Sequence, residues 1–271
     1  MKIAFLGGGN MAGALIGGLL AKGYAADSIS VVEVVVEARA NLAAKYKVHA
    51  SESADARTFA ADTIVLAVKP QDMRNAVAPL AGKLGKQVVI SIAAGIRLQD
   101  LARWLGGYTK LVRVMPNTPA LIGAGIAGLY AGPEVGALER KGAESILEAV
   151  GKTVWVDDES LIDPVTAVSG SGPAYVFYFI ESLEKAGIEL GLAPEAARKL
   201  AIQTFVGAAR LAAESAEPPG TLRERVTSKG GTTEAALKVF AAEDIAGRIG
   251  RALKAASDRG AELGELLGRD G

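Results

Sequence analysis

The first dozen residues constrain the fold more than any other stretch, because a short apolar run leads directly into a glycine-rich turn. Residues 2–6, KIAFL, have the character of a buried strand, and GGGN then opens a helical segment over about residues 11–21. Gly7, Gly9 and Ala12 fit the pattern G-x-G-x-x-A, which allows a tight turn and a close approach of a pyrophosphate to the backbone. Such turns also arise from packing alone, but the strand before and the helix after favour a dinucleotide site.

Four further apolar runs extend this beginning into an alternation of strands and helices. We expect strands at residues 28–36, 61–68, 86–95 and 110–116. Helical spacing lies between them, for example at residues 37–47 and 98–105. The alternation predicts an α/β Rossmann-type N-terminal domain with a parallel sheet, whose ligands bind at the carboxyl ends of the strands.

Three loops follow strands at that edge: VKPQ begins at Val68, SIAAG at Ser91 and MPNTP at Met115. The prolines in two of them stiffen the chain and force extended residues before them, which suits walls around a flat ring. For either proline-containing loop taken alone, a proline that merely ends a strand is the better explanation.

Glu33 lies near the end of the second expected strand, where an acidic side chain can accept hydrogen bonds from both ribose hydroxyls of a dinucleotide. A carboxylate there repels a 2′-phosphate, so Glu33 favours NADH over NADPH. The register of VVEVVVE leaves Glu37 as a second acidic side chain, suited to the first turn of the next helix.

After residue 160 the strand pattern stops, and the chain becomes rich in Ala, Leu, Glu, Lys and Arg with helical spacing. We expect helices that include residues 174–185, 194–215 and 242–267. The acidic run at residues 157–159 reads as a solvated linker, and the default role of Ser169 and Ser171 is to cap the helix that follows. The expected division is a dinucleotide-binding domain at residues 1–158 and an all-α domain at residues 159–271.

Composition narrows the classes of partner for this 271-residue chain. Acidic and basic residues balance at 30 each, so we expect no nucleic acid and no anionic membrane as a partner. The chain has no cysteine, which excludes disulfides and thiolate sites, and we expect no metal. The apolar start could pass for a signal peptide, but glycines interrupt it, and we expect a cytoplasmic protein.

A second glycine-rich opening lies at residues 226–240, VTSKGGTTEAALKVF, before a short amphipathic helix. It lacks a preceding strand and the third small residue of a dinucleotide turn. Free N–H groups at a helix start still bind anions, and the glycines permit close approach. An anion smaller than a pyrophosphate therefore fits this opening better.

Five motifs occur in the order and spacing of the pyrroline-5-carboxylate reductase family, which the chain resembles over nearly its whole length. They are GGGNMA at Gly7, AVKPQ at Ala67, RVMPNTP at Arg113, AVSGSGPAY at Ala167 and VTSKGGTTEAAL at Val226. The resemblance implies a Rossmann domain, an all-α dimerisation domain that interleaves with a second subunit, and a homodimer or a ring of dimers. It also implies reduction of 1-pyrroline-5-carboxylate to L-proline by hydride transfer from NAD(P)H, the final step of proline biosynthesis.

The resemblance also assigns residues to the two ends of the site. On the cofactor side it implies Gly7, Gly8, Gly9, Asn10, Met11, Ala12, Ala67, Val68, Lys69, Pro70, Ala93, Ala94 and Asn117, to which the ribose position adds Glu33. On the substrate side it implies Ser228, Gly230, Gly231, Thr232 and Thr233. The hydroxyl of Thr233 is placed near the ring nitrogen as the catalytic group. Lys229 stands where many relatives have proline.

The chemistry is compatible with a chain that has one histidine. Hydride transfer to a protonated C=N bond needs alignment of the two reactants and no strong acid, so we expect His49 to be a surface residue without a catalytic role. A hydroxyacid dehydrogenase of the same two-domain type would need a lysine base on the first helix of the second domain, and residues 172–184 contain none. A non-catalytic nucleotide-sensing protein would be expected to lose the second glycine-rich opening, which is intact.

Overall fold

The computed structural model describes residues 1–269. They form two compact units, one of Met1–Ser171 together with the chain from Ala255 onward, and one of Gly172–Lys254. The expected sequence boundary after residue 158 lies inside the first of these units.

The first unit is built on a twisted sheet with the strand order β3-β2-β1-β4-β5-β6-β7-β8. Strands β1 to β6 run parallel, β7 is antiparallel to β6, and β8 is parallel to β7. The bounds are β1 Ile3–Leu6, β2 Ile29–Val32, β3 His49–Ser51, β4 Thr63–Leu66, β5 Val88–Ser91, β6 Leu111–Met115, β7 Gly125–Ala131 and β8 Gly151–Trp155.

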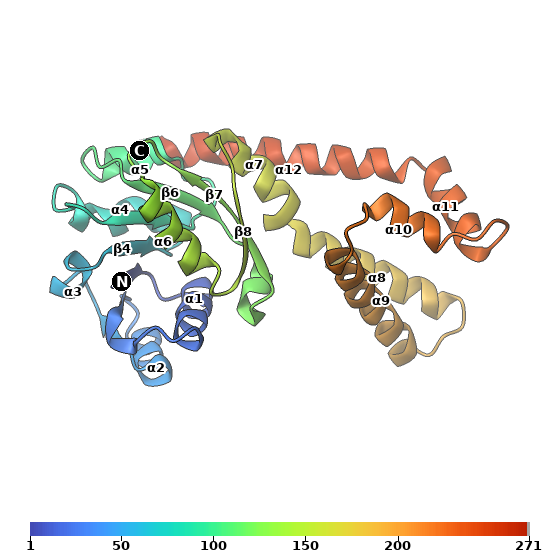
Figure 1. Cartoon of the computed structure of the whole chain (residues 1–271), viewed down its shortest axis with the longest axis horizontal. Helices are drawn as coiled ribbons and strands as arrows, with labels where there is room; N and C mark the ends of the chain where they lie inside the picture. The colour runs from blue at the N-terminus through green and yellow to red at the C-terminus, as the bar shows by residue number, and fades with distance from the viewer. Residues whose placement is uncertain (270–271) are drawn as a thin grey trace. The chain divides into compact units, whose positions relative to one another are not determined.

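Helices cover both faces of this sheet (Figure 1). Side chains of α1, α2 and α6 pack into one apolar cluster, and those of α4 and α5 into a second one on the other face. The bounds are α1 Asn10–Ala21, α2 Val36–Tyr46, α3 Ala56–Phe59, α4 Met73–Val77, α5 Leu98–Trp104, α6 Ala137–Leu147 and α7 Ile162–Val165, and a π-helix follows at Thr166–Gly170.

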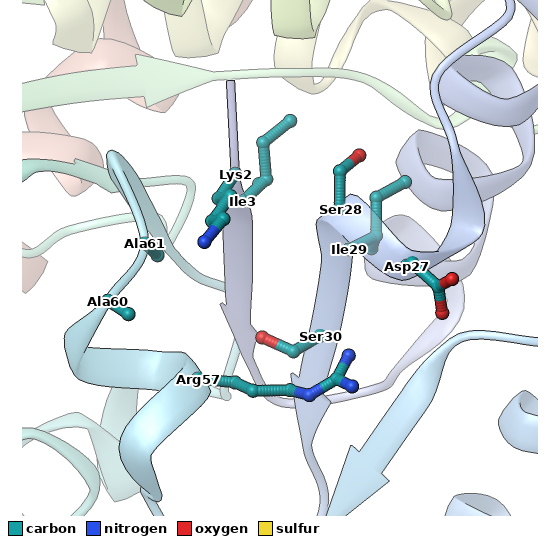
Figure 2. Close-up of a pocket in the computed structure, with 9 residues that line it drawn as sticks. All are labelled: Lys2, Ile3, Asp27, Ser28, Ile29, Ser30, Arg57, Ala60 and Ala61. Atoms are coloured by element: carbon teal, nitrogen blue, oxygen red, sulfur yellow. The ribbon is translucent and has the colours of Figure 1, made fainter.

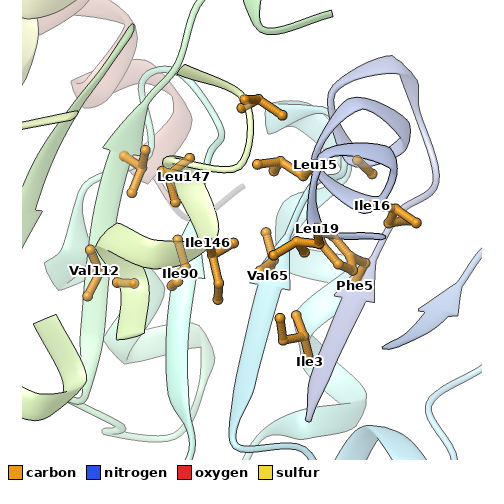
Figure 3. Close-up of a cluster of buried hydrophobic side chains, with 14 of the residues drawn as sticks. Ile3, Phe5, Leu15, Ile16, Leu19, Val65, Ile90, Val112, Ile146 and Leu147 are labelled. Carbon is orange, nitrogen blue, oxygen red and sulfur yellow. The ribbon is translucent and has the colours of Figure 1, made fainter. Parts of the chain in front are cut away.

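Alternate residues of each strand enter opposite clusters, which explains why the strands read as continuous apolar runs. In β1, Ile3 and Phe5 join the cluster under α1 and α6, and Leu6 joins the cluster under α4 and α5. Figure 3 shows the first of these clusters, where Leu19 of α1 lies near Val65 and Phe5, and Ile146 of α6 lies near Ile90. The parallel sheet therefore has the two buried faces that its sequence predicts.

Several expected bounds need correction. The strand expected at residues 28–36 ends at Val32, and Val36 is already the first residue of α2. The N–H of Glu33 still donates to the carbonyl of Ser51 in β3, but the Glu33 carboxylate accepts the N–H of Val35, which therefore does not bond across the sheet. The other expected strands are likewise shorter than their apolar runs. Strands β3 and β7 and helix α6 were not expected from the sequence. Ser169 does not cap the helix that follows it, since its hydroxyl donates to the carbonyl of Val165 at 2.9 Å within the π-helix.

The end of the last helix, α12 (Ile245–Gly268), belongs to the first unit. A Cβ at Gly264 would lie 2.8 Å from Nε of Arg97, so this turn of α12 touches the start of α5. Arg97 donates to the carbonyl of Ala261 at 3.2 Å, and Arg103 donates to that of Gly268 at 2.6 Å. Two arginines thus bind carbonyls at the end of α12, where the helix dipole is negative.

The second unit contains helices only. Its elements are α8 Gly172–Glu189, α9 Pro194–Glu214, α10 Pro219–Arg225, α11 Thr232–Ala242 and the first turns of α12. The helix expected at residues 242–267 is α12, which begins three residues later, at Ile245, because Asp244 has a left-handed backbone (φ 50°) between α11 and α12. Helices α8, α10 and α11 have no fully buried residue among those described.

Candidate active site

The glycine turn after β1 has a backbone that only glycine adopts easily. Gly7 has φ 94° and donates its N–H to the carbonyl of Val32 at 2.8 Å. A Cβ at Gly7 would lie 2.8 Å from the carbonyl oxygen of Ala67. The turn therefore lies where the carboxyl ends of β1, β2 and β4 meet, as the parallel register places them.

The start of α1 is open to an anion. Gly9 is the N-cap residue and supplies no side-chain cap, and a Cβ there would meet nothing within 4 Å. The N–H groups of Asn10, Met11 and Ala12 have no acceptor within residues 1–269. A cavity of about 330 Å³ adjoins Gly9 and Asn10 and extends between α1 and α2. Unpaired donors beside open space fit the pyrophosphate of a dinucleotide.

Glu33 directly follows β2, and its carboxylate lies against the turn. One oxygen accepts the N–H of Gly8 and the other accepts the N–H of Val35, each at 2.8 Å. The acidic group is thus fixed at the end of β2, the place where Rossmann folds bind the adenosine ribose. Val34 and Val35 beside it are largely exposed.

Arg39 holds this loop, a role that was not expected from the sequence. Its guanidinium donates to the carbonyls of Glu33 at 2.6 Å and Val34 at 3.2 Å, and lies 3.7 Å from the carboxylate of Glu52. The sequence offered one signal, since a cation near the start of a helix is unfavourable unless it has another partner.

The remaining expected cofactor residues lie along the same edge. The sheet pattern continues past the strand ends, because Ala67 donates to Leu6 at 2.7 Å and Ile92 donates to Leu66 at 3.2 Å. Lys69 and Ala94 are exposed, and Ala93 is buried. The structure thus brings all the expected cofactor-side residues into one unit, at one edge of one sheet.

Asn117 follows β6 at this edge and is nearly buried. Its side-chain oxygen accepts the N–H of Ile126 at 3.0 Å, and its side-chain nitrogen donates to the carbonyl of Ser169 at 3.2 Å. Gly170 is also close, since a Cβ there would lie 2.5 Å from Cε of Met115. Asn117 therefore fastens the π-helix to the ends of β6 and β7, and π-turns of this kind often mark functional positions.

The second glycine-rich opening forms a loop before α11 in the other unit. Gly230 has φ 74° and donates to the carboxylate of Glu234, and Gly231 donates to the carbonyl of Ser228 at 3.0 Å. Gly231 is the N-cap of α11 and offers no side-chain cap. Within the described chain, the hydroxyls of Thr232 and Thr233 have no hydrogen-bond partner, so they and the first N–H groups of α11 are available to an anion.

His49 lies apart from both sets of residues, on β3. Its Nε2 is 2.7 Å from the carboxylate of Asp55, the N-cap of α3. Burial raises the pKa of Asp55, but hydrogen bonds from His49 and from the N–H groups of Thr58 and Arg57 outweigh it and hold that pKa below its ordinary value. His49 thus contacts the residue that caps α3.

Another cavity, of about 290 Å³, lies at the amino ends of β1 and β2, on the opposite edge of the sheet (Figure 2). Ser30 and the side chains of Lys2 and Arg57 border it. Ligands of doubly wound sheets bind at the carboxyl edge, so this cavity is not the cofactor site. In the part of the chain that the structure describes, no group of three acidic or histidine side chains is placed to hold a metal ion, and no helix is long and apolar enough to cross a membrane.

Comparison with known proteins matches the two parts of the chain to two different family models. The family model described as pyrroline-5-carboxylate reductase dimerisation matches residues 159–263, and that described as NADP oxidoreductase coenzyme F420-dependent matches residues 2–95. A pyrroline-5-carboxylate reductase of Pseudomonas aeruginosa is 48% identical over 269 residues, covering 99% of this chain and 98% of that protein.

Solved structures agree over almost the whole chain. A pyrroline-5-carboxylate reductase of Coxiella burnetii is similar with a TM-score of 0.92 and 40% identity, covering 97% of this chain and 98% of that one. The Plasmodium falciparum pyrroline carboxylate reductase, solved with NADP bound, is similar with a TM-score of 0.85 and 28% identity, covering 97% of this chain and 98% of that one.

Proposed function

The chain belongs to the pyrroline-5-carboxylate reductase family, and we propose that it reduces 1-pyrroline-5-carboxylate to L-proline with a nicotinamide dinucleotide as hydride donor. The observation that carries the proposal is the pair of uncapped, glycine-led helix starts. That of α1 suits a pyrophosphate, and that of α11 suits a carboxylate. A Rossmann-type oxidoreductase needs the first, and an imino acid substrate needs the second.

The residues of the first unit bind and orient the cofactor. The start of α1 binds the pyrophosphate, Glu33 binds the adenosine ribose, and residues 67–70 and 93–94 border the ribose and nicotinamide side. Asn117 lies at the nicotinamide end, where its hydrogen bonds to Ile126 and Ser169 fix the loop. When bound, the dihydronicotinamide supplies a hydride from C4.

The residues of the second unit hold the substrate. The first N–H groups of α11 and the Ser228–Gly231 loop take its carboxylate, which the exposed cation of Lys229 attracts. The hydroxyl of Thr233 hydrogen-bonds to the ring nitrogen. The new C–H bond forms at C5 while the π pair of the protonated C=N bond moves to nitrogen, which keeps its proton and becomes the amine of proline. No further acid is required.

The position of Glu33 supports a preference for NADH. Its carboxylate is fixed by two N–H groups, so it cannot turn away from a 2′-phosphate without losing both hydrogen bonds. Arg39 donates to two carbonyls of the loop and is therefore not available to bind that phosphate. Exposed Val34 and Val35 offer an apolar surface to the adenine ring.

We propose that the chain forms a homodimer through its second unit. We further propose that these dimers assemble into a ring. In α8, Phe177 and Tyr178 are 65% and 66% exposed, and none of its residues is fully buried. An aromatic face of this kind needs an apolar partner. A cytoplasmic location stays a prediction, motivated by the cysteine-free composition.

The test is to measure oxidation of NADH and of NADPH by the purified protein, separately, with and without pyrroline-5-carboxylate. We expect oxidation only with the imine, L-proline as the product, and a higher kcat/KM with NADH. A folded sample that oxidises neither cofactor in the presence of the imine would overturn the proposed reaction. A clear preference for NADPH would overturn only the role of Glu33.

A further inference from the structure

The cavity at the amino ends of β1 and β2 has no part in the proposed reaction, because it lies at the edge of the sheet opposite to the cofactor site (Figure 2). Three segments border it: the start of β1, the turn and strand at residues 27–30, and α3 with the two residues that follow it. Its volume of about 290 Å³ is near the lower end of the range of small-molecule sites.

Two cations border this cavity without an acidic partner. Among residues 1–269, the side chains of Lys2 and Arg57 make no ion pair and no hydrogen bond. The carboxylates near them bind the main chain instead: Asp62 accepts the N–H of Lys2 at 2.7 Å, and Asp55 accepts the N–H of Arg57 at 3.0 Å. Two unpaired cations that reach one hollow from different segments attract an anion.

The wall of the cavity also contains a buried hydroxyl. Ser30 of β2 is only 7% exposed, and within the described chain its hydroxyl makes no hydrogen bond. Figure 2 shows the oxygen of Ser30 on the side of β2 toward α3, above the side chain of Arg57. Because buried hydroxyls are generally hydrogen-bonded, we expect the occupant of the cavity to carry a hydrogen-bond acceptor.

Asp27 limits the charge of that occupant. It borders the same cavity, yet no ion pair joins its carboxylate to Lys2 or Arg57. The lining therefore carries two cations and one carboxylate, and a single negative charge balances it. A dianion would leave an excess of negative charge beside Asp27.

The remaining groups of the lining favour a carboxylate on a small organic molecule. The planar guanidinium of Arg57 can donate two parallel hydrogen bonds to a carboxylate. Ala60 and Ala61 provide methyl groups and no polar side chain, which suits a short hydrocarbon body. We propose that the cavity binds a small monocarboxylic acid in its ionised form, with Arg57 and Lys2 as the counter-charges and the hydroxyl of Ser30 as a donor.

The chain has no cysteine, so a thiol introduced at the cavity is the only one in the full-length protein. Ala60→Cys places it on the cavity wall, and Leu138→Cys, at an 84% exposed position of α6, is the matched control. Butanoate is the probe, and labelling by neutral iodoacetamide reports access to the thiol. With an affinity on the order of 1 mM, about 50 mM butanoate should slow labelling of Ala60→Cys at least about tenfold relative to sodium chloride of equal ionic strength, and should leave Leu138→Cys unchanged.

Arg57→Gln, combined with Ala60→Cys, tests the contact with the carboxylate. Loss of a charge-assisted hydrogen bond should raise the butanoate concentration that gives half protection by about tenfold or more. Butylammonium has the opposite charge and should not protect the thiol. Ser28→Cys, in the turn before β2, provides a second thiol at the cavity if Ala60→Cys does not fold.

Saturable protection at either position, weakened by Arg57→Gln, supports the proposal. It is overturned if neither thiol is protected, if Leu138→Cys is slowed equally, if butylammonium protects as well, or if Arg57→Gln has no effect. Stronger protection by inorganic phosphate than by butanoate would assign the cavity to a phosphate ligand and overturn the carboxylate. None of these results depends on the reductase assay, so the cavity proposal and the proposed reaction can fail separately.

Discussion

At the scale of single residues, Glu33 separates two explanations for an acidic residue after β2. Its carboxylate could serve only to hold the turn, through the N–H groups of Gly8 and Val35, or it could also select the cofactor. The two differ in what a neutral replacement does. If Glu33 only holds the turn, its replacement weakens the binding of NADH and NADPH equally. If Glu33 also selects the cofactor, its replacement changes the ratio of kcat/KM for NADPH to that for NADH.

We expect Glu33→Ser to raise kcat/KM for NADPH relative to NADH by about tenfold or more, because removing the charge removes its repulsion of the 2′-phosphate. Steady-state assays with both cofactors measure this ratio. Glu37→Gln is the matched control, since Glu37 is the other acidic residue of the run and lies within the first turn of α2. A ratio that shifts in Glu37→Gln and stays constant in Glu33→Ser would show that Glu37 faces the ribose.

For Thr233 we expect Thr233→Ala to lower kcat by about tenfold to a hundredfold, the range of one lost hydrogen bond to a charged group, with the KM for NADH nearly unchanged. Thr233→Ser keeps the hydroxyl and should recover most of the rate. Stopped-flow measurement of one turnover separates this step from product release. Loss of NADH binding in Thr233→Ala would contradict a role at the substrate end.

At the scale of elements, the sequence predicted best where one rule governs a segment. The run KIAFL and the glycine turn fix β1 and α1, since a buried parallel strand and a tight turn leave few alternatives. Prediction from the sequence failed where a side chain accepts a backbone N–H that would otherwise continue a strand. The run through Val36 has strand character throughout, yet Glu33 takes the N–H of Val35 and ends the strand.

Contacts distant in the sequence were equally out of reach. Glu159 was interpreted as part of a solvated linker, but it accepts the N–H of Leu98 at 2.8 Å and pairs with buried Arg113 at 3.2 Å. Local composition cannot reveal such partners. The grouping of the expected cofactor residues at one edge of the sheet was predictable because they follow strand ends. Arg39 was missed because its hydrogen bonds depend on where the loop folds back.

The packing of α12 on α5 gives a prediction of its own. We expect Gly264→Leu to lower the free energy of unfolding by about 1–3 kcal/mol, because its side chain would displace Arg97 from the carbonyl of Ala261. Gly142→Leu in α6 is the control, since a Cβ there would have its nearest contact at an ordinary 3.6 Å. Urea unfolding measures the free energy of unfolding of both variants. If Gly264→Leu is as stable as Gly142→Leu, Arg97 can move aside without a loss of stability.

At the scale of the whole molecule, the two units differ in how they bury apolar side chains. The first unit encloses Phe5, Leu15 and Ile90 completely in its own core. In the second, only Ala197 and Ala201 are fully buried in α9, and α8 has no such residue. Helical spacing in the sequence shows that these helices have apolar faces, but it cannot show whether the partner is the same chain or another copy.

The stability of the protein should therefore depend on its concentration. Association that buries α8 stabilises the folded state by mass action, so each tenfold rise in concentration adds about 1.4 kcal/mol per dimer. We expect the thermal midpoint to rise by about 1–2 °C per tenfold increase, because the unfolding entropy of two 271-residue chains is about 1.1 kcal/mol/K. Differential scanning fluorimetry between low and high micromolar concentrations measures this shift, and sedimentation at the same concentrations provides the dimer fraction. A midpoint that stays constant while the dimer fraction rises would mean that the second unit is stable without a partner, and that its exposed aromatic face serves another ligand.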